Sequence, residues 1–505
     1  MNYSPWSLFS ESCNKFPNNI MLIHGNSQFT YAQMMELVLK ASDFIDSMDF
    51  KIGGIFLPNS PQLITYMFAL NKQNKLVVPL SYQLKGESLF RRINYADIEF
   101  LVTDKNGFDE VSKIKDRLQI KYLIVLENEF DVQVYKFDSE KIITEDIKEG
   151  TFGICFTGGS TAEPKGVVLS NYAVSGNALA VADVLQFTSE DSFLIARPLT
   201  QAGPIASDLF MAISCGACVI LLNDLYHPAI FLKTIQELRP TTTYLVRTMM
   251  VQIFDYPFLD RFDISSIKRI ILGAMITPES VFLKTTEKFK NAIVYNAYGL
   301  SEASVRVSFA CSEDLLAYPG TVGRPIKGCD VTIYRDDGSV CEADEIGEIF
   351  VRTDYIMDGY YKCKDKTLEA ITDKGLRTRD KGYKNKEGML FIVGRTDDLI
   401  NQGGNNVYPI EIEQILLMNP LIREAVVIGI DDEKLGQKII ALVRVAEGEN
   451  VLVQDLYKWC RANLEDRKIP REIVIVEKMP RNEMGKLNKN ILRSFYIDQI
   501  QNRRS

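Results

Sequence analysis

The sequence predicts an α/β protein with a large N-terminal domain, made of two doubly wound sheets and a small β-barrel, followed by a small C-terminal α+β domain. From residue 54 to residue 272, short β-branched and apolar runs alternate with helical patterns, which is typical of βαβ units in parallel sheets. Beyond Thr321, short strands follow one another with only turns between them. The 505 residues also exceed what one hydrophobic core normally serves.

The first sheet is predicted from the segment that ends near residue 126. A helical stretch from residue 8 leads to a hairpin-like segment at 21–30 and a helix at about 31–48. His24 lies in this hairpin, where a structural role is the simpler interpretation. The elements predicted next are strands at 54–57, 75–79, 100–103 and 122–126 and a helix at 62–72.

The second sheet is predicted after a glycine-rich loop at 157–166. A helix at 173–184 and an apolar helix after Pro204 accompany strands at 192–196, 218–222, 242–245 and 267–272. Doubly wound folds bind ligands in the loops that follow parallel strands. Two segments fall at such strand ends, Gly273-Ala-Met275 and Asn296-Ala-Tyr-Gly-Leu-Ser-Glu302.

The remaining residues predict the barrel and the C-terminal domain. Short strands at 331–334, 347–352 and 389–393 indicate a small β-barrel-like unit. The charged turn at 395–398 is the predicted boundary, which gives domains at 1–396 and 397–505. The elements predicted for the second domain are helices at 409–418 and 452–463 and strands at 425–429, 439–445 and 472–476.

Composition argues against several classes of protein. The net charge of −8 gives no general attraction to nucleic acid or to anionic membranes. No apolar run approaches the ~20 residues that span a bilayer. The first residues lack the basic and apolar regions of a secretory signal, so a cytoplasmic location is expected. His24 and His227 are the only histidines, which leaves little material for Ser-His-Asp catalysis or histidine-rich metal sites.

The nine cysteines are scattered along the chain. Cys215 and Cys218 form the only close pair, within a pattern that reads as a helix end, a turn at Gly216 and a buried strand. No second CxxC and no histidine partner is available for zinc. We therefore expect two buried structural thiols in a protein whose cysteines are reduced.

The loop Thr157-Gly-Gly-Ser-Thr-Ala-Glu-Pro-Lys-Gly166 has the composition of a phosphate-binding loop. Its glycines and hydroxyls allow backbone amides to turn toward an anion, and Lys165 supplies positive charge. The loop differs from the P-loop, which has GKS or GKT after a four-residue gap. On composition alone, a flexible surface loop is an equally good interpretation.

Further clusters carry chemistry but are individually weak. Tyr298-Gly-Leu-Ser-Glu302 offers an aromatic face that can stack on a base and a carboxylate that suits Mg²⁺, which prefers oxygen ligands. Asp380 and Arg395 bracket a hairpin, where they could bind ribose hydroxyls and a phosphate. The adjacent Gly403 and Gly404 allow close backbone approach by a ligand. Taken alone, each of these segments is better interpreted as ordinary structure such as a plain solvated turn, and Lys486 as an exposed loop lysine.

In this order and spacing, the segments resemble the adenylate-forming superfamily of acyl- and aryl-CoA synthetases, nonribosomal peptide synthetase adenylation domains and firefly luciferase. The resemblance runs from the first helix to near residue 495. Besides the loop at 157–166 and Tyr298-Gly-Leu-Ser-Glu302, it rests on 321–325, 347–349, Thr378-Arg-Asp380, Gly394-Arg-Thr-Asp-Asp398, Gly403-Gly404, 408–413 and Asn482-Glu-Met-Gly-Lys486.

The resemblance implies that a carboxylate attacks the α-phosphorus of ATP with Mg²⁺, and that a thiol of coenzyme A or of a carrier-protein phosphopantetheine then takes the acyl group. The small C-terminal domain is implied to be mobile and to rotate between the steps. The implied catalytic residues are Lys486, Glu302 (also the metal ligand) and Thr161. The implied nucleotide site comprises Thr157, Gly159, Ser160, Thr161, Lys165, Gly273, Ala274, Asn296, Ala297, Tyr298, Gly299, Ser301, Asp380, Arg395 and Lys486. The implied acid pocket comprises Gln201, Ala274 and Ala297, the thiol tunnel Gly403 and Gly404, and the hinge Asp397.

Departures from the family pattern bear on activity and substrate. Gly158, Ala162, Arg379 and Asn401 replace usual residues, yet Lys165, Glu302, Asp380, Arg395 and Lys486 remain, which favours an active enzyme. Gln201 stands where amino-acid-activating relatives carry aspartate, so an unpaired substrate ammonium would be costly there.

An aryl or short-to-medium acyl acid and coenzyme A are the leading expectation. A ligase that loads an acyl carrier protein is the alternative, and a degenerate nucleotide-binding relative is a third hypothesis. No nucleic-acid partner and no membrane span are expected.

Overall fold

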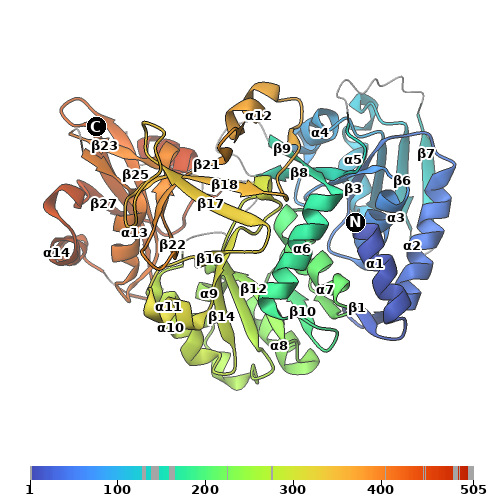
Figure 1. The fold of residues 1–505 in the computed structure, drawn as a ribbon, viewed down its shortest axis with the longest axis horizontal. Helices are drawn as coiled ribbons and strands as arrows, with labels where there is room; N and C mark the ends of the chain where they lie inside the picture. The colour runs from blue at the N-terminus through green and yellow to red at the C-terminus, as the bar shows by residue number, and fades with distance from the viewer. Residues whose placement is uncertain are drawn as a thin grey trace.

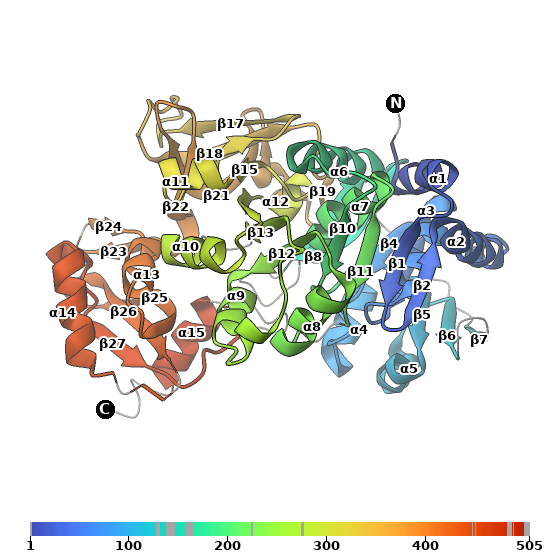
Figure 2. The ribbon, with the colours of Figure 1, turned by 90° about the horizontal axis from the view of Figure 1, so that it is seen from below.

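The computed structural model describes residues 3–127, 132–137, 147–157, 165–223, 226–273, 277–403, 405–446, 448–449, 451–481, 487 and 489–498. Two large sheets with their helices form most of the molecule, and a small antiparallel sheet lies beside them (Figure 1). The last elements of the chain gather at one end, opposite the first helices (Figure 2). The predicted α/β class with a large and a small domain is confirmed.

The eight-stranded sheet has a parallel centre and antiparallel edges. Its centre is a run of parallel strands, and the hairpin β8–β9 brings Thr157 opposite Lys165. In spatial order the strands are β19 (Gly359–Tyr360), β9 (Lys165–Ser170), β8 (Thr151–Thr157), β4 (Leu76–Pro79), β3 (Ile52–Phe56), β5 (Phe100–Asp104), β6 (Tyr122–Leu126) and β7 (Val132–Lys136). The glycine-rich loop therefore joins two neighbouring antiparallel strands.

The nine-stranded sheet includes the first two strands of the chain. Leu22 pairs in parallel with Val219, so β1 extends this sheet and not the one nearer in sequence. In spatial order the strands are β16 (Arg324–Pro325), β15 (Ser308–Ala310), β14 (Ile293–Tyr298), β13 (Arg269–Gly273), β12 (Thr242–Val246), β10 (Ser192–Ile195), β11 (Cys218–Leu221), β1 (Ile20–His24) and β2 (Ser27–Thr30).

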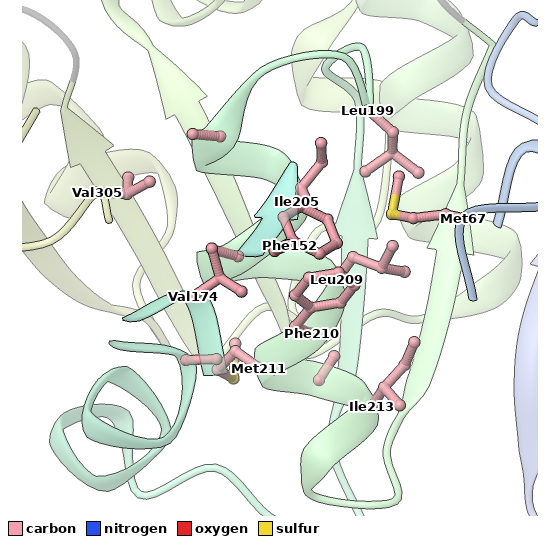
Figure 3. Packing of buried hydrophobic residues seen from close by; sticks show 14 of the residues in the cluster. Met67, Phe152, Val174, Leu199, Ile205, Leu209, Phe210, Met211, Ile213 and Val305 are labelled. Carbon is pink, nitrogen blue, oxygen red and sulfur yellow. The ribbon is translucent and has the colours of Figure 1, made fainter. Parts of the chain in front are cut away.

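A layer of helices packs between the two large sheets. Phe210 of this layer contacts Phe68 and Phe152, with ring centres 5.6 and 5.5 Å apart, and one continuous apolar core joins both sheets. Figure 3 shows Ile205, Leu209 and Phe210 gathered with Phe152 and Met67. The helices of this core are α1 (Pro5–Lys15), α2 (Tyr31–Asp46), α3 (Pro61–Lys72), α6 (Asn171–Leu185), the π-helical η2 (Gly203–Phe210) and α7 (Met211–Ser214).

Local sequence explains where several of these helices begin. Ser4 and Thr30 each accept a hydrogen bond from a backbone amide of the first turn, and the residue at that position bonds back to the cap. Ser60 and Ser170 cap α3 and α6 with a single hydrogen bond, which the serine hydroxyl accepts from a backbone amide of the first turn. The apolar helix expected after Pro204 is wider than an α-helix, because η2 is a π-helix, a form often found at functional sites.

Other helices cover the outer faces of the sheets. The eight-stranded sheet carries α4 (Gly86–Tyr95) and α5 (Lys105–Ser112). The nine-stranded sheet carries α8 (Pro228–Leu238), α9 (Arg247–Phe254), α10 (Glu279–Lys288) and α11 (Ser312–Ala317). Short 3-10 turns complete this part at η1 (Lys115–Arg117), η3 (Leu259–Arg261) and η4 (Ser301–Ala303).

The small sheet corresponds to the predicted barrel-like unit. It is antiparallel, and Asp380 of β21 pairs with Arg395 of β22. Its strands are β17 (Cys329–Tyr334), β18 (Gly347–Thr353), β20 (Ile371–Thr372), β21 (Gly375–Lys384) and β22 (Leu390–Arg395), and α12 (Lys364–Ala370) lies beside β20.

The C-terminal elements form a sheet with an apolar core on each face. An ion pair between Arg423 and Asp255 of the segment after α9, at 3.0 Å, links it to the larger part. The 396/397 boundary stays a prediction and falls within η5 (Thr396–Asp398). The elements are β23 (Ile400–Gln402), β24 (Asn405–Val407), α13 (Pro409–Leu417), β25 (Ile422–Asp432), β26 (Gly436–Val445), α14 (Val453–Asn463), η6 (Asp466–Lys468), β27 (Glu472–Ile475) and α15 (Lys489–Tyr496).

Several details differ from expectation. Cys215 and Cys218 are partly exposed and not buried as predicted, because they flank the turn at Gly216 (φ +74°) that leads into β11. The segment predicted as a strand at 425–429 extends over Ile422–Asp432, since its partner β26 is equally long. His24 has a structural contact, with Nδ1 3.1 Å from the Leu221 carbonyl oxygen. In the part of the chain that the structure describes, no helix combines the length and apolarity needed to cross a bilayer.

Candidate active site

Several predicted site residues meet at the carboxyl end of β14. The hydroxyl of Tyr298 donates a hydrogen bond to Asp380 Oδ2 at 2.6 Å. Arg395 Nε lies 3.9 Å from Asp380 Oδ1. Burial raises the pKa of Asp380, and Arg395 and the Tyr298 hydroxyl oppose that rise. The pairing of β21 with β22 therefore places Asp380 and Arg395 beside the ring of Tyr298, the last residue of β14.

A second group lies beside these residues. The hydroxyl of Tyr360 donates a hydrogen bond to Glu302 Oε1 at 2.7 Å, and Lys165 Nζ lies 5.3 Å from the centre of the Tyr360 ring. The pairing of β19 with β9 brings Tyr360 to the strand that Lys165 begins. Burial, followed by the charges of Lys366 and Arg379, lowers the pKa of the Lys165 ammonium.

We call these six residues the β14 cluster: Lys165, Tyr298, Glu302, Tyr360, Asp380 and Arg395. They come from all three sheets of the larger part and from the short turn η4. The amide of Met357 donates to the Glu302 carbonyl at 2.8 Å and so holds that turn in place. The cluster presents two aromatic rings, two carboxylates and two cations on adjoining elements, which suits a ligand that carries both a base and phosphates.

Two glycines permit close approaches beside the cluster. A Cβ on Gly299 would lie 1.5 Å from the Val305 carbonyl oxygen, so only glycine fits this crossing. A Cβ on Gly273 would lie 2.4 Å from Tyr244 Oη and 2.8 Å from the Ala297 carbonyl oxygen. Gly273 and Ala297, near the ends of β13 and β14, are therefore neighbours of Tyr244, whose strand β12 pairs with β13.

Other predicted residues lie elsewhere or are engaged within the protein. The amide of Asn296 is 2 % exposed, donates to the Thr321 carbonyl and accepts from Thr277, so its side chain is not available to a nucleotide here. Gly403 lies in the C-terminal sheet, where its amide donates to the Leu435 carbonyl. Asp397 lies in η5 and forms an ion pair with Arg379 at 3.6 Å. Thr157, Ser301 and Gln201 are partly exposed.

The remaining predicted residues fall outside the described part of the chain. These are Gly159, Ser160, Thr161, Ala274, Gly404 and Lys486. Their roles stay predictions. Among the described residues, no group of three or more His, Cys, Asp or Glu side chains is arranged to hold a metal ion by itself.

A further polar group, which sequence reasoning missed, lies under the ends of β12 and β10. Arg197 Nη2 forms an ion pair with Asp208 Oδ2 at 2.5 Å, and the Arg197 guanidinium lies 3.6 Å from the ring centre of Tyr244. Arg306 lies 4.5 Å from the same ring centre. We call Arg197, Asp208, Tyr244 and Arg306 the arginine cluster. Tyr360 was missed as well, because its link to Glu302 depends on strand pairing that no local pattern reveals.

Comparison with family models places two matches on the chain. The model described as AMP-binding enzyme matches residues 9–361, and the model described as AMP-binding enzyme C-terminal domain matches residues 411–486.

Full-length relatives match with modest identity. The chain is 29 % identical to a 2-succinylbenzoate–CoA ligase of Bacillus cereus over 92 % of this chain and 93 % of that protein. It is 28 % identical to an indoleacetate–CoA ligase of Aromatoleum aromaticum, with 86 % of each chain covered. It is 26 % identical to an oxalate–CoA ligase of Arabidopsis thaliana, with 97 % and 98 % covered.

Solved structures match over nearly the whole chain. An o-succinylbenzoate coenzyme A synthetase from Bacillus subtilis, in complex with ATP and magnesium ion, has a TM-score of 0.84 and 26 % identity over 96 % of this chain and 99 % of that one. An anthranilate CoA ligase in complex with anthranoyl-AMP has a TM-score of 0.88 with 97 % of each chain covered, but at 19 % identity it supports the fold alone.

Proposed function

This chain belongs to the AMP-binding enzyme family, and we propose that it activates a carboxylic acid as an acyl-AMP and transfers the acyl group to coenzyme A. The observation that carries this proposal is the β14 cluster, in which Tyr298, Asp380 and Arg395 adjoin Lys165 and Glu302. These residues offer a surface for a base, partners for a ribose and charges for phosphates on one strand end.

In the first step, an oxygen of the substrate carboxylate attacks the α-phosphorus of ATP. The bond from that phosphorus to the bridging oxygen breaks, and pyrophosphate leaves with the electron pair. We assign Tyr298 to the adenine, Asp380 and Arg395 to the ribose, and Ser301 to the α-phosphate. Protein groups contribute mainly position and charge neutralisation in such transfers. The β- and γ-phosphates would be held by Thr157, Gly159, Ser160, Thr161 and Lys165.

Glu302 fits a magnesium site shared with the nucleotide. Its Oε1 accepts the Tyr360 hydroxyl, which orients the carboxylate. Magnesium is commonly bound by one or two protein carboxylates together with substrate phosphates and water, so a single carboxylate here is sufficient. When bound, the ion would offset negative charge on the phosphates. A homologous structure from Bacillus subtilis contains ATP and magnesium.

In the second step, the sulfur of the thiol attacks the acyl carbon, and AMP leaves with the oxygen of the broken anhydride bond. We propose that the C-terminal domain rotates about Asp397 between the steps. Lys486 would act in the first step, and Gly403 and Gly404 would line the thiol path in the second. A mobile domain can supply a charge only when it is needed.

The acid is proposed to be an aryl or short-to-medium acyl acid. Relatives named for 2-succinylbenzoate, indoleacetate and oxalate span both types. Gln201 and Ala297 line the proposed pocket with a neutral amide and a small wall, which disfavours a substrate ammonium. Transfer to a carrier-protein phosphopantetheine is the alternative second step. We also propose a reducing compartment, since all nine cysteines are free thiols.

The test is ATP–pyrophosphate exchange across a broad panel of acids. We expect exchange with at least one acid class and a loss of about a hundredfold or more in Lys486→Ala. Lys478→Ala, which removes an exposed lysine from the same domain, serves as the matched control and should retain the exchange rate. Absence of exchange with every acid would instead support a nucleotide-binding relative without catalysis. Comparison of coenzyme A with a carrier protein as acceptor decides the second step.

A further inference from the structure

Arg306 is buried, and no described acidic side chain forms an ion pair with it. It is 5 % exposed, and its Nε and Nη2 meet no hydrogen-bond acceptor in the described part of the protein. An arginine side chain stays protonated in proteins, so it cannot relieve burial by losing its charge. Burying such a group without an anion is strongly unfavourable. The aromatic ring of Tyr244, 4.5 Å away, offsets only part of this cost.

The arginine cluster carries an excess positive charge. It holds two guanidinium groups, Arg197 and Arg306, and one carboxylate, Asp208, which pairs with Arg197 at 2.5 Å. Tyr244 is 1 % exposed, and its hydroxyl has no hydrogen-bond partner among the described residues. An anion is therefore needed to balance the charge, and a hydroxyl donor is already in place to bind it.

The backbone that carries Arg306 is strained. Ser304 and Val305 have φ values of +48° and +104°, in the region that favours glycine, and a β-branched residue is rarely found there. The close crossing of Val305 and Gly299 holds this conformation. Residues kept in such conformations cluster at ligand sites, where the surrounding structure maintains them. The strain supports a functional position for the Arg306 side chain.

The arginine cluster adjoins the proposed acid pocket. Tyr244 Oη lies against Gly273, whose neighbour across the strands is Ala297, a predicted wall of that pocket. Arg197 Nη1 lies 3.6 Å from the position of a Cβ on Gly203, two residues beyond Gln201. The cluster thus lies next to neighbours of both Ala297 and Gln201, two residues that are proposed to line the pocket.

We infer that the substrate acid carries a second carboxylate, which Arg306 and the Tyr244 hydroxyl bind while the first carboxylate is activated. This inference rests on the proposed function and specifies its substrate class. A guanidinium can donate two parallel hydrogen bonds to a carboxylate, and the phenol donates a third. An analogue with a neutral amide in place of the second carboxylate leaves the buried charge unbalanced and is rejected.

The test compares diacids with their half-amides in ATP–pyrophosphate exchange. Succinate is compared with succinamate and phthalate with phthalamate, so that aliphatic and aryl acids are both sampled. We expect kcat/KM for the preferred diacid to exceed that of its half-amide by about a hundredfold or more, as sites built around buried polar groups do. In Arg306→Met the ratio of the two kcat/KM values should fall toward one. In Arg306→Lys, which keeps the charge but loses the two parallel donors of the guanidinium, the ratio should be intermediate.

Binding without turnover gives an independent readout. The preferred diacid should raise the melting temperature of the wild-type protein in the absence of ATP, and should not do so in Arg306→Met. Arg269→Met is the matched control, because Arg269 also lies near an aromatic ring, Phe187, but pairs with Asp191 at 2.8 Å. It should leave the diacid preference unchanged. If Arg306→Met fails to fold, Tyr244→Phe still tests the site and should reduce the preference.

The outcomes separate this inference from the proposed function. Exchange with half-amides as fast as with diacids, or a preference unchanged in Arg306→Met, overturns the inference while the function stands. No exchange with any acid overturns the function. In that case, diacid-dependent stabilisation that is lost in Arg306→Met would still support the second-carboxylate site, and its absence would overturn the inference too.

Discussion

The β14 cluster and the arginine cluster are both polar and each includes a tyrosine of the nine-stranded sheet, yet their charges are balanced differently. In the β14 cluster, Asp380 is paired with Arg395 and Tyr298, and Glu302 with Tyr360. In the arginine cluster, the single carboxylate of Asp208 pairs with Arg197, and Arg306 Nε and Nη2 have no acceptor among the described residues. Both carboxylates of the β14 cluster have partners within the cluster, whereas the arginine cluster lacks an anion for Arg306.

If the proposed assignments hold, the β14 cluster binds a ligand that is constant in the family and the arginine cluster binds one that varies. ATP is the same for every member of the family, so partners that hold each other in place can preorganise its binding site. The acid differs among relatives named for different substrates. Groups left without partners near the acid pocket therefore report which acid this chain takes.

The largest expected effect distinguishes the two arginines of the arginine cluster. Arg197→Met leaves Asp208, 1 % exposed, without its partner, and should reduce the free energy of unfolding by about 3–5 kcal/mol. Arg306→Met removes a charge that has no partner in the protein and should be neutral or stabilising. Thermal and urea unfolding of both variants measure this. Equal losses would mean that Arg306 is paired as well as Arg197 is, and would remove the contrast between the clusters.

A smaller effect is expected in the β14 cluster. Asp380→Ala removes the acceptor of the Tyr298 hydroxyl and the partner of Arg395, and should lower kcat/KM for ATP by about a hundredfold. The ratio of diacid to half-amide activity should stay unchanged, because Asp380 belongs to the other cluster. Asp336→Ala serves as the control. It removes an exposed aspartate that pairs with Lys381, the residue after Asp380 in β21. A changed acid preference in Asp380→Ala would show that the clusters are coupled.

Tyr360→Phe should have a milder effect of the same kind. The substitution keeps the ring next to Lys165 but removes the hydroxyl that donates to Glu302. We expect kcat/KM for ATP to fall about tenfold as a result. We expect the concentration of Mg²⁺ that gives half-maximal exchange to rise. Tyr383→Phe, whose ring stacks on Phe391 in the small sheet, is the comparison variant. An unchanged magnesium dependence would argue against Glu302 as a metal ligand.

The smallest effect concerns alkaline pH. Burial, together with the Lys366 and Arg379 charges, places the pKa of Lys165 below its ordinary value of 10.5. Between the folded pKa and 10.5, the folded protein binds fewer protons than the unfolded chain, so this group adds stability as pH rises. Phosphate binding needs the charged form, so kcat/KM for ATP should fall over the same window. Lys165→Arg should remove this fall, because its guanidinium stays protonated; a fall that persists there arises from another group.

Local sequence accounts for part of the fold and of the candidate site. Alternation of strands and helices predicted the α/β fold, because hydrophobic period depends on local sequence. It did not reveal that β1 joins the second sheet, since that pairing spans distant segments. Tyr298, Asp380 and Arg395 were predicted together only through resemblance, and their roles stay predictions. Arg306 gave no signal, because a pattern does not show whether a buried charge has a partner.

The pairing of β1 with β11 also affects the order in which the protein can fold during synthesis. His24 contacts Leu221 across 197 residues of chain, which a ribosome adds in roughly 10–40 s. Throughout that interval, the hairpin β1–β2 has no parallel neighbour, and an apolar strand edge is open to wrong partners. The nine-stranded sheet can be completed only after its later strands are synthesised, and β1 and β2 then form one edge of it.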